Sequence, residues 1–88
     1  MLDLIYKNSF HKDWKRLKKR NYNYDKLENV LNLLIHRQPL PNSFRLHTLQ
    51  GEWAGYKECH IAPDWLLIYL ETATSIILVR TGTHSDLF

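Results

Sequence analysis

The stretch WLLIYLETATSIILVRTGTH, residues 65–84, is the part of this chain from which its fold is first inferred. Its two apolar runs, 65–70 and 75–81, are rich in branched and aromatic residues, which is typical of buried strands. Only residues 71–74 separate the runs, a length that suits a short hairpin connection. The pattern therefore predicts two buried antiparallel strands.

The residues before this hairpin predict two helices and further strands. Apolar residues recur at helical spacing in two stripes, and the segments 2–6, 45–49 and 56–61 have strand character. The first stripe is Phe10, Trp14 and Leu17, and the second is Leu27, Val30, Leu31, Leu34 and Ile35. We expect Asp25 to cap the second helix, with Glu28 completing a capping-box-like pattern, and Pro39 to follow its end. The order β-α-α-β-β-β(-β) predicts a single α+β domain over residues 1–88, with two N-terminal helices packed on a small antiparallel sheet.

Composition excludes several classes of protein. Cys59 is the only cysteine, so an intramolecular disulfide and a cysteine-rich zinc site are both ruled out. The first ten residues do not resemble a signal peptide, and no apolar run is long enough to cross a bilayer. A cytoplasmic protein is therefore expected.

The net charge of +3 is unevenly distributed along the chain. Six of the twelve Lys and Arg residues lie between Lys12 and Arg20, on the faces of the first helix away from its apolar stripe. This cluster is either a solvated helix face or a surface that meets phosphates.

Polar residues gather at the ends of the predicted strands. His60 and Asp64 flank one turn, while Arg80 and His84 end or follow the last strand. If the last two strands pair antiparallel, these four side chains converge, and His47 can join them from the neighbouring strand. Imidazoles suit general acid and base roles, and a guanidinium suits a phosphate that gains charge in a transition state. Each residue alone also has a purely structural explanation, such as an Arg80–Asp64 salt bridge.

Other chemistries fit this sequence less well. Three histidines and a carboxylate are possible metal ligands, but no ligand pair has tight helical spacing and Arg80 would oppose a cation. Cys59 lies in mid-strand and faces away from its neighbours Glu58 and His60, so it is a poor nucleophile. Trp65 is either a core residue or, like Phe88, a ring on which an RNA base stacks.

The motif HxLQGxWxGYxExHIxPDWLLIY, followed by RTGTHSxLF, resembles the YafQ branch of the RelE superfamily of bacterial toxins. The likeness extends over essentially the whole chain and includes the segment QPLP, residues 38–41. It implies a RelE-like fold and a metal-independent endoribonuclease, without cofactor, that cuts mRNA in the ribosomal A site by attack of the 2′-OH. It also implies a cognate antitoxin of the DinJ or RelB type.

The resemblance assigns roles to the strand-end residues. It implies that His84 is the general acid, Asp64 or His60 the base, and Arg80 the group on the phosphate, while His47 orients the substrate or assists proton transfer. Trp65 and Phe88 would contact the substrate. Lys15, Lys18 and Lys19 would contact ribosomal RNA or acidic residues of the antitoxin. The alternatives are a non-catalytic nucleic-acid or partner-binding module on the same fold, and a metal-dependent hydrolase.

Overall fold

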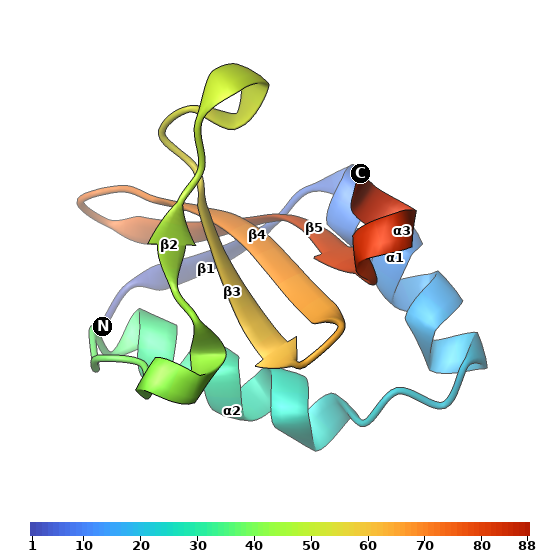
Figure 1. The fold of residues 1–88 in the computed structure, drawn as a ribbon. Coiled ribbons are helices and arrows are strands. Elements are labelled where there is room, and N and C mark those ends of the chain that lie inside the picture. Colours follow the sequence, from blue (N-terminus) through green and yellow to red (C-terminus); the bar gives the residue numbers. More distant parts are fainter.

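The computed structural model describes all residues 1–88 and confirms the α+β architecture. Its helices and strands follow the expected order, with one additional short helix near residue 88 (Figure 1). The elements are β1 (Asp3–Tyr6), α1 (Asn8–Lys19), α2 (Tyr24–Ile35), β2 (His47–Thr48), β3 (Lys57–Ala62), β4 (Trp65–Glu71), β5 (Ser75–Gly82) and α3 (His84–Leu87), with 3-10 turns η1 (Asn42–Phe44) and η2 (Gly51–Trp53).

The five strands form one mixed sheet in the order β1-β5-β4-β3-β2. The predicted hairpin of β4 and β5 is confirmed as an antiparallel pair at the middle of this sheet. The expectation of a wholly antiparallel sheet is wrong for β1, which pairs with β5 in parallel. Sequence alternation indicates that residues 2–6 are extended, but it does not specify which strand they pair with, or in which direction.

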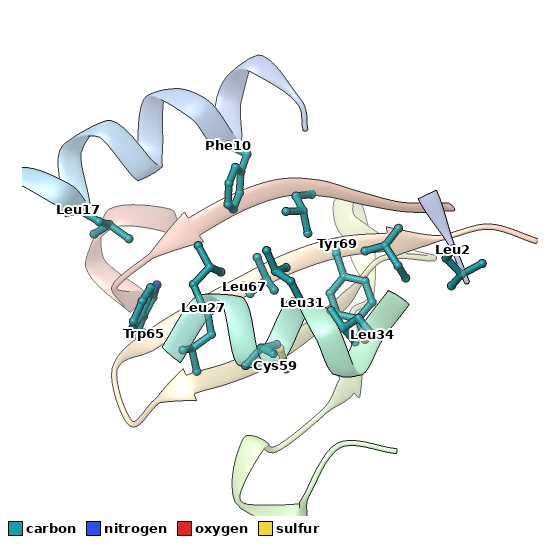
Figure 2. Close-up of a cluster of buried hydrophobic side chains, with 14 residues drawn as sticks. Leu2, Phe10, Leu17, Leu27, Leu31, Leu34, Cys59, Trp65, Leu67 and Tyr69 are labelled. Atoms are coloured by element: carbon teal, nitrogen blue, oxygen red, sulfur yellow. The ribbon is translucent and has the colours of Figure 1, made fainter. Parts of the chain in front are cut away.

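The hydrophobic core lies between one face of the sheet and the two long helices. Figure 2 shows Leu27, Leu31 and Leu34 of α2 directed toward the sheet, with Phe10 and Leu17 of α1 beside them. The strands contribute Cys59, Ile61, Trp65, Leu67, Tyr69, Ile76 and Leu78 to the same cluster. Both helical stripes predicted from the sequence therefore face the core.

The opposite face of the sheet carries Glu58, His60, Leu66, Ile68 and Arg80, and we call it the site face. These residues alternate along their strands with the core residues, or face one another in the strand register. Leu66 and Ile68 are fully buried, although neither belongs to the core cluster between sheet and helices. The site face therefore has a small apolar floor of its own.

Helix α1 covers the edge of β5 beyond the point where β1 ends. The register of β1 stops at Leu78, so the later backbone groups of β5 lack a strand partner. Ser9 Oγ donates to the carbonyl of Val79 at 2.6 Å, and the Asp13 carboxylate accepts from the Thr81 N–H at 3.1 Å. Side chains of α1 thus replace strand pairing, as a buried sheet edge requires.

Three local features differ from the sequence predictions. The N-cap of α2 is Asn23, whose side chain accepts from the Asp25 N–H at 2.8 Å, so the expected cap at Asp25 is wrong by two residues. The strand expected over 45–49 is reduced to His47–Thr48. Helix α3 was not expected, although Thr83 and Asp86 form a reciprocal capping box that begins it.

None of the helices combines the length and the apolar character that crossing a membrane would require.

Replacing Asp13 with Ala should reduce the free energy of unfolding by about 3 kcal/mol, because Arg80 and the Thr81 N–H both lose their acceptor. Urea unfolding followed by circular dichroism measures this change. Asp3→Ala, which removes an exposed carboxylate from β1, is the control and should change the free energy by less than about 0.5 kcal/mol. Equal effects of the two substitutions would contradict the role given to Asp13.

Candidate active site

One row of residues crosses the site face from β2 to β5. The strand register places His47 opposite Glu58, Glu58 opposite Ile68, and Ile68 opposite Arg80. Paired residues share a face of the sheet, and adjacent strands lie about 4.8 Å apart. The Cα atoms of Glu58 and Arg80 are therefore about 10 Å apart, with the apolar Ile68 between them.

A β-bulge at Val79 turns Arg80 toward the site face. Tyr69 pairs with Leu78 and Ile68 pairs with Arg80, so Val79 is an extra residue on β5. Without it, Arg80 would point to the core side together with Leu78, because side chains alternate along a strand. The bulge thus reverses the direction of one side chain, a common function of bulges near active sites.

Asp13 holds the guanidinium of Arg80. Arg80 Nε donates to Asp13 Oδ2 at 2.6 Å and Nη2 donates to Oδ1 at 3.2 Å. Hydrogen bonding to this carboxylate raises the pKa of Arg80 above its usual value. Asp13 also accepts from Arg16 Nη2 at 3.1 Å. The Arg80–Asp64 salt bridge, which the sequence allowed as a purely structural explanation, is not formed. Arg80 Nη1 has no protein partner, and the side chain is 28% exposed.

His84 and Asp64 meet where β4 begins and β5 ends, as the antiparallel pairing predicts. The backbone N–H of His84 donates to Asp64 Oδ1 at 3.0 Å, and both side chains are exposed. The imidazole of His84 lies against Phe88, with ring centroids 5.3 Å apart. Phe88 is 58% exposed, so a face of its ring is free to contact a ligand.

Helix α3, which carries His84, is fixed by Asp86. Arg20 donates to both oxygens of Asp86, at 2.9 and 3.2 Å, and the Thr83 N–H donates at 2.9 Å. These hydrogen bonds hold the pKa of Asp86 well below its usual range. Gly82 precedes α3 with φ +155°, and a Cβ there would lie 3.0 Å from Asp86. The close approach of Asp86 therefore requires glycine at this position.

His47 and His60 lie on either side of the buried carboxylate of Glu58. Their ring centroids are 6.4 Å apart, and Glu58 Oε1 lies 3.1 Å from His47 Nε2 and 3.9 Å from His60 Nε2. The sequence predictions included both histidines but not Glu58. The available signal was its position two residues before His60, which places the two side chains on the same face of a strand.

The five predicted strand-end residues thus form two groups, and Arg80 lies apart from both. His47 and His60 form one group with Glu58, and Asp64 and His84 form the other. Arg80 lies in the same strand row as His47 but is bound to α1.

Trp65 and Cys59 lie in the core. Trp65 is 3% exposed, its Nε1 donates to Thr81 Oγ1 at 2.9 Å, and its ring packs against Trp14 and Tyr22. This burial favours a packing role at the start of β4, next to Asp64, over a stacking contact with substrate. Burial raises the pKa of the Cys59 thiol to about 12, in keeping with a poor nucleophile.

The basic residues of α1 divide into two sets. Arg16 and Arg20 form ion pairs with Asp13 and Asp86. Lys12, Lys15, Lys18 and Lys19 are exposed and form no ion pair. The charge available to a ligand on this helix is therefore carried mainly by lysine.

Comparison with known proteins gives consistent results over the whole chain. A family described as "Bacterial toxin of type II toxin-antitoxin system, YafQ" matches residues 2–88. The mRNA interferase toxin YafQ of Escherichia coli K12 is 42% identical over 87 residues, which cover 98% of this chain and 95% of the relative. A chain in a crystal structure of the E. coli DinJ-YafQ complex is 42% identical and superposes with a TM-score of 0.92, covering 100% of this chain and 99% of that one. A copper-bound mutant toxin from Helicobacter pylori is 41% identical, with a TM-score of 0.95 and full coverage of both chains.

The order of the elements and the similarity to solved YafQ structures define a small toxin with the RelE-like fold. The chain belongs to the YafQ family of toxins from bacterial type II toxin–antitoxin systems.

Because the pKa of Asp86 is lowered in the folded protein, part of the free energy of unfolding should be lost in acid. Because the folded-state pKa lies below the unfolded value, Asp86 contributes stability above about pH 4 that is lost as the pH falls through the folded-state pKa. The free energy of unfolding should therefore fall more steeply between about pH 4 and pH 2 for the wild type than for Asp86→Asn. Urea unfolding over this pH range measures the difference, with exposed Asp25→Asn as control. Parallel curves for wild type and Asp86→Asn would refute the contribution of Asp86.

Proposed function

We propose that this chain is the toxin of a type II toxin–antitoxin module and cleaves mRNA as an endoribonuclease, in the ribosomal A site. The observation that carries this proposal is that Asp64 meets His84 where β4 begins and β5 ends, while His47, Glu58 and Arg80 lie in one row across the site face. An mRNA interferase that is 42% identical over nearly the whole chain gives independent support. The cytoplasm, where translation takes place in bacteria, is the compartment in which such a toxin acts.

The proposed reaction is an in-line transfer within the RNA backbone. The 2′-oxygen loses its proton to a base and attacks the adjacent phosphorus. A new O2′–P bond forms as the P–O5′ bond breaks, and the departing 5′-oxygen takes a proton from an acid. The products are a 2′,3′-cyclic phosphate and a 5′-OH, and the reaction requires an acid, a base and a cation at the phosphate.

We assign the acid to His84 and the base to His60 or Asp64, while His47 orients the substrate or assists proton transfer. His84 lies on α3, and its backbone is held by Asp64 while its ring remains exposed. The Asp64 contact therefore fixes the position of the acid, and the second oxygen of Asp64 remains available to the reaction. His60 is partly buried and His47 exposed, so substrate can reach either imidazole from the site face.

Arg80 and Phe88 bind the substrate in this proposal. Two of the Arg80 nitrogens are held by Asp13, which leaves Nη1 to stabilise the charge on the phosphate. A guanidinium fixed in advance loses little conformational freedom when the transition state forms. The exposed ring of Phe88 offers a surface on which a base next to the cleaved phosphate stacks.

Restraint of such a toxin requires a partner. YafQ of E. coli occurs in a complex with DinJ. We propose that an antitoxin of the DinJ or RelB type binds this chain in the same way. We propose further that Lys15, Lys18 and Lys19 contact ribosomal RNA, for which exposed lysines without ion pairs are suited.

The main alternative is a module of the same fold that binds RNA or a partner without cleaving it. The exposed His84 next to Asp64, and the two imidazoles around Glu58, favour catalysis because a binding surface has no need of this acid–base geometry. A binder would leave the message uncut on translating ribosomes. A metal-dependent hydrolase would lose its activity in the presence of a chelator.

His84→Ala and Arg80→Ala should each lower the rate of mRNA cleavage by about 100-fold or more and abolish growth arrest, because the acid or the phosphate cation is removed. Growth after induction and cleavage of a defined message measure both effects. Matched expression and circular dichroism are needed for Arg80→Ala, which also leaves Asp13 without its partner. His36→Ala, a change at an exposed histidine outside the site, is the control. Wild-type growth arrest by both site variants would exclude this site.

Reversing the charges of Lys15, Lys18 and Lys19 to Glu should weaken ribosome binding and make its salt dependence shallower, by about one unit of slope for each lysine that neutralises a phosphate in the wild type. Sedimentation with ribosomes over a series of salt concentrations provides the measurement. Lys26→Glu on α2 controls for a charge change elsewhere on the surface. Unchanged affinity and slope would remove this helix from the ribosome interface.

A further inference from the structure

Glu58 is a buried carboxylate whose ion-pair partners are two histidines. It is 3% exposed near the start of β3, and its Oε1 lies 3.1 Å from His47 Nε2 and 3.9 Å from His60 Nε2. Its neighbour across β4 is the apolar Ile68. A buried carboxylate is costly unless donors satisfy it, so its ionised form depends on these imidazoles.

The other nitrogen of each imidazole faces a backbone carbonyl. His47 Nδ1 lies 2.9 Å from the carbonyl oxygen of Arg45, and His60 Nδ1 lies 3.2 Å from that of Pro63. A carbonyl oxygen only accepts hydrogen bonds, so these contacts require hydrogen on both Nδ1 atoms. The two rings are therefore held in the same way, with Nδ1 toward the backbone and Nε2 toward Glu58.

If both imidazoles are neutral and Glu58 is ionised, these contacts have fewer N–H donors than they need. A neutral imidazole carries a single N–H, which the Nδ1 contact uses, and its Nε2 then presents a lone pair. An ionised carboxylate also only accepts. The 3.1 Å contact between His47 Nε2 and Glu58 Oε1 therefore requires one additional proton on the two histidines and Glu58.

We propose that Glu58 is a positioning residue that joins His47 and His60 into one charged unit. The unit holds one proton beyond the two on the Nδ1 atoms, and this proton lies in the 3.1 Å contact between His47 Nε2 and Glu58 Oε1. His60 Nε2 lies 3.9 Å from the same oxygen, too far for a hydrogen bond, so this ring is neutral and its Nε2 keeps the lone pair that a base requires.

The inference rests on the proposed ribonuclease function for its catalytic part. The neutral ring takes the proton of the 2′-OH on Nε2 as the O2′–P bond forms. The P–O5′ bond breaks and the 5′-oxygen receives its proton from His84. Glu58 remains a carboxylate and stabilises the new imidazolium, and release of a proton to water restores the unit.

Arg45 lines a pocket with His60 and forms no ion pair, while the other charged groups near this unit have partners of their own. Asp64 accepts from the backbone of His84, and Arg80 is bound to Asp13 beyond Ile68. Lys57, the neighbour of Glu58 on β3, pairs with Glu71 at 3.6 Å. Glu58 is therefore the only carboxylate within ion-pair distance of both imidazoles.

Glu58→Gln tests the catalytic role, because it keeps the size of the side chain and removes its charge. We expect kcat for cleavage to fall at least about tenfold, with KM changed less than about twofold, since Glu58 does not touch the RNA. Glu58→Asp, which keeps the carboxylate, should retain more activity than Glu58→Gln. Glu71→Gln, a carboxylate-to-amide change elsewhere in the sheet, is the matched control. A kcat for Glu58→Gln equal to that of the control would overturn the catalytic role.

The ion pair itself is tested without any RNA, by NMR of the imidazole nitrogens at neutral pH. In the wild type, His47 should give the signals of an imidazolium, and His60 those of a neutral ring with hydrogen on Nδ1, as the contacts of the two rings require. In Glu58→Gln, His47 should become neutral, while exposed His11 and His36 serve as unchanged references. A neutral His47 in the wild type would overturn the inference. An imidazolium at His47 in a wild-type protein that cuts no RNA would support the unit and refute the ribonuclease function.

Discussion

The geometry of the candidate site depends on one buried carboxylate, that of Asp13. It receives hydrogen bonds from Arg80, from Arg16 and from the backbone of Thr81, and is itself 3% exposed. Through these bonds it attaches α1 to the free edge of β5 and fixes the guanidinium of Arg80. A buried carboxylate and a partly buried guanidinium are each costly when unpaired. Removing either side chain therefore destabilises the fold, because the other charge is left without its partner. The contacts of Asp13 thus hold α1 on the sheet and orient the guanidinium of Arg80.

The site has a base side and an acid side that are held by different means. On the base side, backbone carbonyls and Glu58 fix the rings of His47 and His60. On the acid side, α3 is a helix of four residues that cannot be stable alone, and its position comes from Arg20, Asp64 and its own capping box. Rigid placement of acid, base and cation before substrate binds is the arrangement by which enzymes stabilise a transition state electrostatically.

The sequence predicted what depends on local pattern and missed what depends on long-range pairing. The apolar runs of β4 and β5 and the stripes of α1 and α2 are periodic, so the fold class and the meeting of Asp64 with His84 followed from them. The parallel partner of β1 and the bulge at Val79 leave no periodic signal, because each is decided by contacts between distant segments. For that reason Arg80 was expected beside Asp64 rather than Asp13. Asp13 and Glu58 were overlooked as well, since a lone acidic residue in a helix or strand is ordinarily a solvated one.

The most direct test of the account is to map the cleavage sites and end groups on a defined message, with and without ribosomes. Cuts should depend on ribosomes, fall within A-site codons, and leave a 2′,3′-cyclic phosphate and a 5′-OH. His84→Ala should give the full-length message under the same conditions. Intact message with the wild-type protein on translating ribosomes, or products with a 5′-phosphate, would contradict it.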